Sequence, residues 1–149
     1  AQVHAADLSP DALAVTAKNA ELLGASVTLH QGDLFAAVPE IAFDVIVSNP
    51  PYIPRNDIPG LDHSVRDYEP HLALDGGEDG LDFYRAICEK WTAALVPGGR
   101  LYFEVGIGQA DSVLRLMRAQ GFGDIQVVKD HNDIPRVVFG TLCSEVYSE

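Results

Sequence analysis

The chain has 149 residues, of which 47% are hydrophobic and 21% charged, and this length and composition are typical of one globular domain that buries a core. No apolar run approaches the roughly 20 residues of a membrane span, and the first residues lack the basic start of a signal peptide, so we expect neither a membrane protein nor a secreted one. Ten Lys and Arg against 22 Asp and Glu give a net charge of −12, which argues against direct binding to nucleic acid, because basic side chains supply most of the affinity for phosphates.

The negative charge and the two cysteines also indicate the kind of partner and the redox compartment of the protein. A negative surface would favour a partner with a basic surface, such as a ribosome-associated protein, although the charge could equally serve only solubility. Cys88 and Cys143 have no C-x-x-C spacing, so they indicate two reduced thiols rather than a disulfide framework or a zinc site. The five histidines are scattered without the spacing of metal ligands. We therefore predict a cytoplasmic protein without a metal.

The first part of the chain predicts a strand, a helix and a second strand. Residues 3–6 form the short strand, after which Ser9 supplies a helix cap and Pro10 the first helical residue. Gly24 ends this helix. Apolar and polar residues alternate over residues 26–31, which predicts the second strand, and the next three residues turn out of it.

A third strand and a long loop come next. Residues 43–48 predict the strand, and their nearly continuous apolar run suggests burial on both faces, as in a parallel sheet. Residues 51–80 contain four prolines and four glycines, which predicts an irregular stretch. Loops of this length inside a compact domain are usually functional or disordered.

The second half of the chain predicts two helices and three strands. The helices cover residues 81–95 and 109–120, and Gly121 ends the second one. Apolar side chains at helical spacing are expected to face the core: Phe83, Ile87, Trp91 and Leu95 in the first helix, and Val113, Leu116 and Met117 in the second. The strands are expected at residues 100–105, after a Pro-Gly-Gly turn, and at 125–128 and 137–140.

Strands that alternate with helices predict an α/β sandwich around a mostly parallel sheet. The last two strands could form a C-terminal hairpin with one antiparallel strand. We find no internal repeat, low-complexity segment or linker, so we expect one domain over residues 1–149. In such a sheet, ligands bind outside the carboxyl ends of the strands.

Three of these strand ends carry polar residues. Asp7 follows the first strand, where its carboxylate could bind a ribose diol or contribute to the helix cap. Asp33 follows the second strand, where it could accept a hydrogen bond from an adenine amino group, with Leu34 as an apolar neighbour, or belong to a plain turn. Asn49 follows the third. Three neighbouring strand ends of this kind predict a nucleoside-binding site better than any one alone.

The tetrapeptide Asn49-Pro50-Pro51-Tyr52 predicts a rigid recess for a planar amino group. Two prolines remove two backbone donors and fix two φ angles, so the recess keeps its shape without a ligand. The proline after Asn49 also keeps that residue extended. An amide carbonyl, a backbone carbonyl and an aromatic face can therefore converge on an amide or an amino-base, although the tetrapeptide could instead be a structural turn.

These residues resemble those of a known family. The combination of Asp7-x-Ser9-Pro10, Gly32-Asp33-Leu34-Phe35 and Asn49-Pro50-Pro51-Tyr52-Ile53 is similar to the class I S-adenosylmethionine-dependent methyltransferases. Further segments narrow the resemblance to the HemK-type protein-glutamine methyltransferases of peptide-chain release factors: Tyr68-Glu69-Pro70, residues 72–80, Glu104-Val105-Gly106 with Gln109, and Arg136-Val137-Val138. The tetrapeptide alone is shared with DNA adenine-N6 methyltransferases.

The resemblance implies a Rossmann-like class I methyltransferase sandwich with S-adenosylmethionine as its cofactor. It implies that the cofactor is bound by Asp7, Asp33, Leu34 and Asn49. It also implies that Asn49, Pro50 and Tyr52 are catalytic and that the substrate is held by Asn49, Pro50, Pro51, Tyr52 and Glu69. The implied partner is the Gly-Gly-Gln loop of a release factor.

The chain departs from that family at its start. The glycine-rich loop that holds the methionine part of the cofactor, the first strand before it and the preceding helical domain are all missing. We therefore expect a fragment of a catalytic domain. Because a missing central strand would leave two sheet edges unpaired, we also expect self-association.

Alternatives remain open from the sequence for the acceptor, for activity and for two carboxylates. The acceptor could be an exocyclic amine of a nucleic acid, although the acidity opposes it, or the fragment could be inactive. The carboxylate of Glu104 is interpreted as a cap for a neighbouring helix rather than as a site residue. Glu69 lies in the long loop and could shape the entrance for the substrate.

Overall fold

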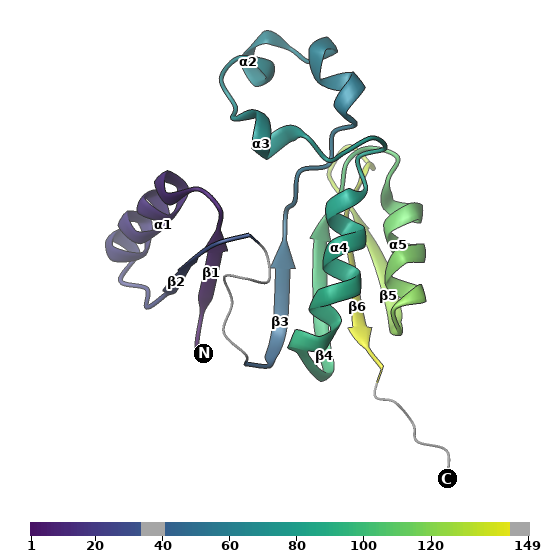
Figure 1. Ribbon diagram of the computed structural model, residues 1–149. Coiled ribbons are helices and arrows are strands. Elements are labelled where there is room, and N and C mark those ends of the chain that lie inside the picture. Colours follow the sequence, from purple (N-terminus) through teal and green to yellow (C-terminus); the bar gives the residue numbers. More distant parts are fainter. Residues whose placement is uncertain (34–40, 144–149) are drawn as a thin grey trace. The chain divides into compact units, whose positions relative to one another are not determined.

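The computed structural model describes residues 1–33 and 41–143, and the chain divides into two compact units, Ala1–Ile41 and Ala42–Glu149. Figure 1 shows the helices and strands of each unit. Each unit has its own sheet: two strands in the first and four in the second.

The first unit is a strand-helix-strand arrangement, as the sequence predicts. Its elements are β1 (His4–Asp7), α1 (Pro10–Leu23) and β2 (Thr28–Gln31), and β1 pairs with β2 in parallel. The Ser9 side chain caps α1 by accepting a hydrogen bond from the Ala12 amide at 3.3 Å, and Gly24 ends the helix with a φ of 64°. Among its described residues, none is fully buried, so this unit lacks a closed core of its own.

The second unit contains a four-stranded sheet in the order β3-β4-β6-β5. The strands are β3 (Phe43–Ser48), β4 (Leu95–Glu104), β5 (Phe122–Lys129) and β6 (Pro135–Leu142). β3 and β4 are parallel, whereas β6 is antiparallel to both β4 and β5. The expected closing hairpin with one antiparallel strand is therefore confirmed, and its strands are longer than predicted.

Two helices cover one face of this sheet (Figure 1). They are α4 (Asp82–Trp91), which continues into the 3₁₀ turn η3 (Thr92–Ala94), and α5 (Ala110–Ala119). The core between helices and sheet consists of fully buried side chains, among them Tyr84, Ile87, Val113, Met117, Leu101, Phe103 and Val138. The rings of Tyr84 and Phe103 meet edge to face with centroids 5.2 Å apart.

The expected apolar stripe of the first long helix is only partly confirmed. Ile87 and Leu95 are buried as predicted, but Phe83 and Trp91 are half-buried, and Leu95 is the first residue of β4 rather than part of the helix. Four-residue steps drift by about 40° each around a helix with 3.6 residues per turn, so a stripe of this spacing leaves the buried face. In the second helix Val113 and Met117 face the core, while Leu116 is half-buried.

The expected burial of β3 on both faces is wrong for the described structure. Ile46 is buried, but Val45 is 51% exposed and Val47 75% exposed. Successive side chains of a strand point to opposite faces, so Ile46 lies on the face opposite to Val45 and Val47, and α4 and α5 cover only one face of this sheet (Figure 1). β3 is also an edge strand of its sheet, since it pairs only with β4 among the described strands.

The stretch from residue 51 to 80 is less irregular than predicted. It contains three short helical turns: η2 (Arg55–Gly60), α2 (His63–Arg66) and α3 (His71–Leu74). Asp62 caps α2 by accepting a hydrogen bond from the Ser64 amide at 2.9 Å, which explains why a turn forms among residues with weak helix propensity. Ile58 of η2 and Leu74 of α3 are buried, whereas α2 has no buried residue.

Candidate functional site

Residues 49–52, which we call the 49–52 segment, start at the carboxyl end of β3, directly after Ser48. Asn49 is exposed, Pro50 is buried, and Pro51 and Tyr52 are half-buried. Within the described part of the chain, the Asn49 side chain makes no hydrogen bond. The segment therefore offers one available amide group on a base that two prolines stiffen.

The residues directly after this segment are bonded to a later part of the same loop, residues 74–77. Arg55 and Asp75 form a salt bridge at 2.8 Å, which holds the pKa of the Asp75 carboxyl below its ordinary value. Three backbone hydrogen bonds join the same two stretches: Ile53 N–H to Leu74 C=O at 3.1 Å, Gly76 N–H to Ile53 C=O at 2.9 Å, and Arg55 N–H to Gly77 C=O at 2.8 Å. The loop thus fixes the chain immediately beyond Tyr52.

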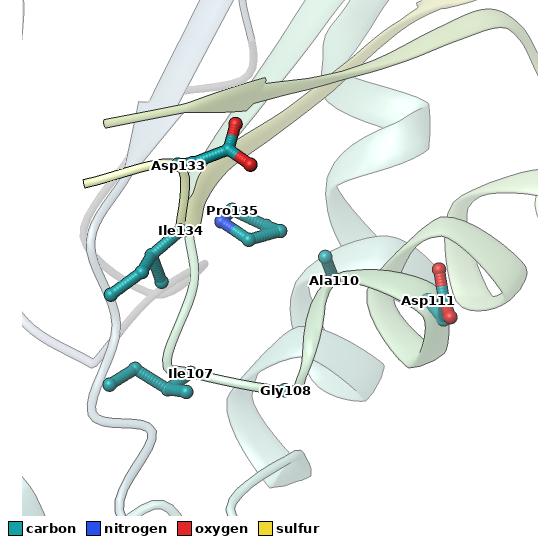
Figure 2. Close-up of a pocket in the computed structure, with 7 residues that line it drawn as sticks. All are labelled: Ile107, Gly108, Ala110, Asp111, Asp133, Ile134 and Pro135. Atoms are coloured by element: carbon teal, nitrogen blue, oxygen red, sulfur yellow. The ribbon is translucent and has the colours of Figure 1, made fainter. Parts of the chain in front are cut away.

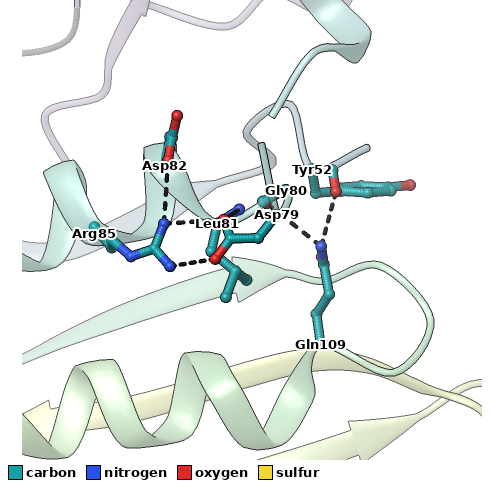
Figure 3. A network of polar contacts seen from close by, with 7 residues as sticks. All are labelled: Tyr52, Asp79, Gly80, Leu81, Asp82, Arg85 and Gln109. Atoms are coloured by element: carbon teal, nitrogen blue, oxygen red, sulfur yellow. Dashed lines mark hydrogen bonds and ion pairs between the residues drawn. The ribbon is translucent and has the colours of Figure 1, made fainter. Parts of the chain in front are cut away.

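Gln109 also contacts this region, through the backbone of Tyr52 (Figure 3). Its Nε2 donates to the Tyr52 carbonyl at 2.8 Å and to the Gly80 carbonyl at 3.4 Å, and its Oε1 accepts a hydrogen bond from the Gly106 amide at 3.1 Å. One side chain therefore joins three separate stretches of backbone around Tyr52.

Three buried glycines pack against Tyr52. A Cβ atom at Gly76 would lie 2.8 Å from the Tyr52 Cα, and one at Gly106 would lie 2.8 Å from the Tyr52 ring. A Cβ atom at Gly80 would overlap the Tyr52 carbonyl oxygen, and its φ of +77° also disfavours any other residue. The backbone of the 49–52 segment is consequently enclosed where side chains of other residues would not fit.

An acidic cluster fixes the loop to the start of α4 (Figure 3). Arg85 binds Asp79 through two hydrogen bonds, one of them at 3.0 Å, and Asp82 at 3.1 Å. The hydrogen bond from Arg85 is the main cause that lowers the pKa of the Asp79 carboxyl to about 2. Asp79 also accepts a hydrogen bond from the Leu81 amide at 3.0 Å, so Gly80 is held from both neighbours.

Glu104 does not have the predicted role. Its backbone carbonyl accepts a hydrogen bond from the Tyr84 hydroxyl at 2.8 Å, while its side chain is exposed. The start of α5 has no side-chain capping bond, and neither has the start of α4. The interpretation of Glu104 as a helix cap is therefore wrong; what matters structurally is its main-chain carbonyl. Burial of the Tyr84 hydroxyl raises its pKa.

The predicted cofactor residues Asp7 and Asp33 lie in the first unit. Asp7 is the last residue of β1, and its Oδ1 accepts a hydrogen bond from the Ser9 amide at 2.8 Å, so one carboxylate oxygen supports the start of α1. The Gly32 amide donates to the Asp7 carbonyl at 3.1 Å, which brings the carboxyl ends of β1 and β2 together. Asp7 and Asp33 are both exposed there. Leu34 lies outside the described residues.

Glu69 is exposed and precedes Pro70, the residue before α3. Its backbone amide donates to the Val65 carbonyl at 3.0 Å. The structure assigns its carboxylate no contact with the 49–52 segment among the described residues, so its part in substrate entry stays a prediction.

A hollow of about 300 Å³ opens between the loop after β4 and the turn before β6 (Figure 2). Ile107 and Ile134 extend to the same side of it, and Asp111 and Asp133 also line it. Because β3 and β4 are parallel, this hollow lies at the same end of the sheet as the 49–52 segment. Ile107 is 70% exposed.

The two cysteines differ in burial. Cys88 lies in the core, and burial raises the pKa of its thiol to about 12, which makes it unreactive. Cys143 is exposed.

Among residues 1–33 and 41–143 no group of three or more His, Cys, Asp or Glu could hold a metal ion. In the same part of the chain, no helix is both long and apolar enough to cross a bilayer.

Sequence reasoning placed Asn49 to Tyr52 correctly after a strand but assigned no role to Gln109 or to the glycines around Tyr52. The available signal was the Gly-rich stretch at residues 76–80 and the three-residue spacing of Gly106 and Gln109 before a helix. Such a spacing lets a side chain fold back on the backbone amide before it.

Comparison with known proteins identifies similar sequences. The sequence model of one protein family, the methyltransferase small domain, matches residues 1–59. A release factor glutamine methyltransferase of Geobacter sulfurreducens is 51% identical over 142 residues, which cover 95% of this chain and 50% of that protein. A release factor glutamine methyltransferase of Cereibacter sphaeroides is 48% identical over 140 residues, which cover 93% of this chain and 50% of that protein. The chain thus spans about half the length of the curated relatives it matches.

Solved structures give the same fold. A release factor-specific protein-(glutamine-N5) methyltransferase of Alicyclobacillus acidocaldarius is 28% identical with a TM-score of 0.54, covering 96% of this chain and 80% of that one. A methyltransferase of Pyrococcus furiosus is 19% identical with a TM-score of 0.72, covering 96% and 64%, and shows the fold alone. The predicted fold of the class I methyltransferases is therefore confirmed.

Proposed function

We infer that the chain belongs to the family of the release factor glutamine methyltransferases, about half of whose length it matches, and that it carries the acceptor site and part of the donor site for methyl transfer to a glutamine side-chain amide. The methyl donor is S-adenosylmethionine, and the substrate is a peptide chain release factor. Residues 1–149 are proposed to form one partial catalytic domain.

One observation supports this proposal most strongly. The Asn49 amide is exposed, makes no hydrogen bond within the described residues, and follows a parallel strand at its carboxyl end. Ligands in sheets of this kind bind at that end. A side chain so placed, on a stretch enclosed by glycines and prolines, suits recognition of a ligand better than a role in packing.

The proposed chemistry follows from the nature of the acceptor. A glutamine amide nitrogen is a weak nucleophile because its lone pair is delocalised into the carbonyl. The Asn49 side-chain oxygen and the Pro50 backbone carbonyl each accept one N–H of this amide, which orients the nitrogen and favours electron density on it as the methyl group is transferred. Tyr52 packs against the flat face of the amide. We assign no general base.

For the donor, the carboxylates at the ends of the first two strands have suitable chemistry. An exposed carboxylate such as Asp7 can accept hydrogen bonds from a ribose diol, and Asp33 can accept one from an adenine amino group. Leu34 is proposed to contact the adenine, and Asn49 to border the cofactor as well. S-adenosylmethionine supplies a methyl group already activated by a sulfonium, so the protein has mainly to position the two reactants.

The partner is proposed to present its glutamine in a Gly-Gly-Gln loop, because two small residues let a side chain reach a recessed amide site. Pro51 lines this recess beside Pro50, and Glu69 is proposed to border its entrance. The net charge of −12 suits a basic partner and opposes nucleic acid as the substrate. A release factor works on the ribosome, so we place the protein in the cytoplasm.

We also propose that the chain self-associates through β3. This strand pairs on one side only among the described strands, and Val45 and Val47 are 51% and 75% exposed. An edge strand with exposed apolar side chains is a template for pairing with another chain. Sedimentation velocity of the chain and of its Val47→Lys variant tests this point, and a monomer at all concentrations contradicts it.

Methyl transfer is tested with a chimera in which this chain replaces the matching half of the Geobacter sulfurreducens relative. The chimera is incubated with S-adenosylmethionine and, separately, with a release factor, DNA or RNA, and the products are examined by mass spectrometry. We expect one methyl group on the amide of one glutamine of the release factor. Methylation of a nucleic acid and not of the protein contradicts the proposal, as does no transfer by a folded chimera.

A further inference from the structure

We propose that Gln109 is a positioning residue that fixes the 49–52 segment for methyl transfer through the backbone carbonyl of Tyr52. The inference deepens the proposed function and rests on it, since it concerns the same site. Gln109 precedes α5 as its N-cap residue but makes no side-chain capping bond there. Its side chain is instead used for contacts with other segments.

Every polar atom of the Gln109 side chain has a partner. One N–H of Nε2 points to the Tyr52 carbonyl at 2.8 Å and the second to the Gly80 carbonyl at 3.4 Å, while Oε1 accepts from the Gly106 amide at 3.1 Å. A primary amide has two N–H donors and an oxygen with two lone pairs, so both donors are used and one lone pair of Oε1 is engaged by Gly106. Gln109 is thus suited to holding the backbone and not to touching the substrate.

The surroundings of this side chain leave it little freedom. A Cβ atom at Gly80 would lie 2.7 Å from Nε2, and one at Gly106 would lie 2.8 Å from Oε1. Glycine costs more backbone entropy on folding than other residues. Two buried glycines therefore face the two ends of this amide, and a side chain at either position would collide with it.

The position of Tyr52 is consequently fixed from two sides. Gln109 holds its carbonyl, and the next residue, Ile53, is bonded to Leu74 and Gly76 through its amide and its carbonyl. Pro50 and Pro51 have fixed φ angles, so a shift at Tyr52 is passed to the Pro50 carbonyl and to Asn49. A displacement of about 1 Å at a reacting group can cost roughly 100-fold in rate.

The first test uses the 149-residue chain and amide hydrogen exchange. Gln109→Glu keeps the acceptor for the Gly106 amide but loses both donors, whereas Gln109→Met has nearly the same shape and loses all three bonds. In both variants we expect the Ile53, Arg55 and Gly76 amides to exchange about tenfold faster, as for the loss of roughly one hydrogen bond. The Gly106 amide should exchange faster only in Gln109→Met. Gln126, exposed on β5, provides matched Glu and Met controls.

The second test uses the chimera and steady-state kinetics. We expect Gln109→Met to lower kcat for release-factor methylation about 100-fold while both KM values change by less than about threefold. Gln126→Met should leave kcat and both KM values unchanged. Equal exchange in the Gln109 and Gln126 variants, or an unchanged kcat in an active chimera, overturns the positioning role. If the unsubstituted chimera does not methylate the factor, the proposed function fails, and hydrogen exchange alone then decides whether Gln109 fixes Tyr52.

Discussion

Substitution of Gly80 by alanine measures how tightly the backbone is packed around Tyr52. The φ of +77° alone costs an alanine about 1–2 kcal/mol. The added Cβ would also overlap the Tyr52 carbonyl oxygen and lie 2.7 Å from Gln109 Nε2, and overpacking of this kind costs about 1–3 kcal/mol more. We therefore expect Gly80→Ala to lower the free energy of unfolding by about 2–5 kcal/mol.

Gly98 provides a matched control. Its φ of +82° is nearly the same, but an added Cβ there meets no atom within 4 Å, so Gly98→Ala should cost only the backbone part, about 1–2 kcal/mol. Guanidinium unfolding of the chain can be followed through Trp91, its single tryptophan, with the denaturant slope checked for constancy. Equal losses in the two variants would refute tight packing at Tyr52.

Three further predictions concern other parts of the structure. Tyr84→Phe removes the part-buried hydrogen bond of 2.8 Å from the Tyr84 hydroxyl to the Glu104 carbonyl and should lower the free energy of guanidinium unfolding by about 1–2 kcal/mol; no measurable loss would contradict this account. Arg85→Ala should raise the pKa of Asp79 from about 2 toward the ordinary 3.8, and NMR titration of the Asp79 carboxyl measures this change. Because the folded pKa is depressed, the stabilisation from Asp79 is present above 3.8 and lost as the pH falls toward 2, and this loss should shrink in the variant. Amides of α1, which has no buried residue, should exchange faster with solvent than those of α5, which has three, and the reverse order would count against the burial described.

Local signals in the sequence predicted the elements well where a single residue type sets the geometry. Ser9, Pro10 and Gly24 bound α1 as expected, because a cap, a fixed φ and a left-handed end are local properties. Asn49 likewise follows β3 as expected. Such features do not depend on distant parts of the chain.

Features that depend on tertiary packing were predicted less well. The apolar composition of β3 gave no indication that Val47 would be exposed, because coverage of a sheet face depends on where the helices lie. The contact of Gln109 with Tyr52 joins residues 57 positions apart, and no local pattern encodes such a pair. The glycines at residues 76, 80 and 106 were visible in the sequence, but the atoms that require them were not.

The most direct test of the central claim is the effect of Asn49→Ala on glutamine methylation by the chimera. Asn19, exposed on α1, provides the matched control Asn19→Ala. Mass spectrometry of the release factor would give the rate of methyl incorporation at the glutamine amide. We predict that Asn49→Ala lowers kcat about 100- to 1,000-fold, as for the loss of a group that stabilises the reacting atoms, and that Asn19→Ala has no effect. Methylation by Asn49→Ala at the rate of the control would contradict the assignment of Asn49 as the residue that binds the acceptor amide.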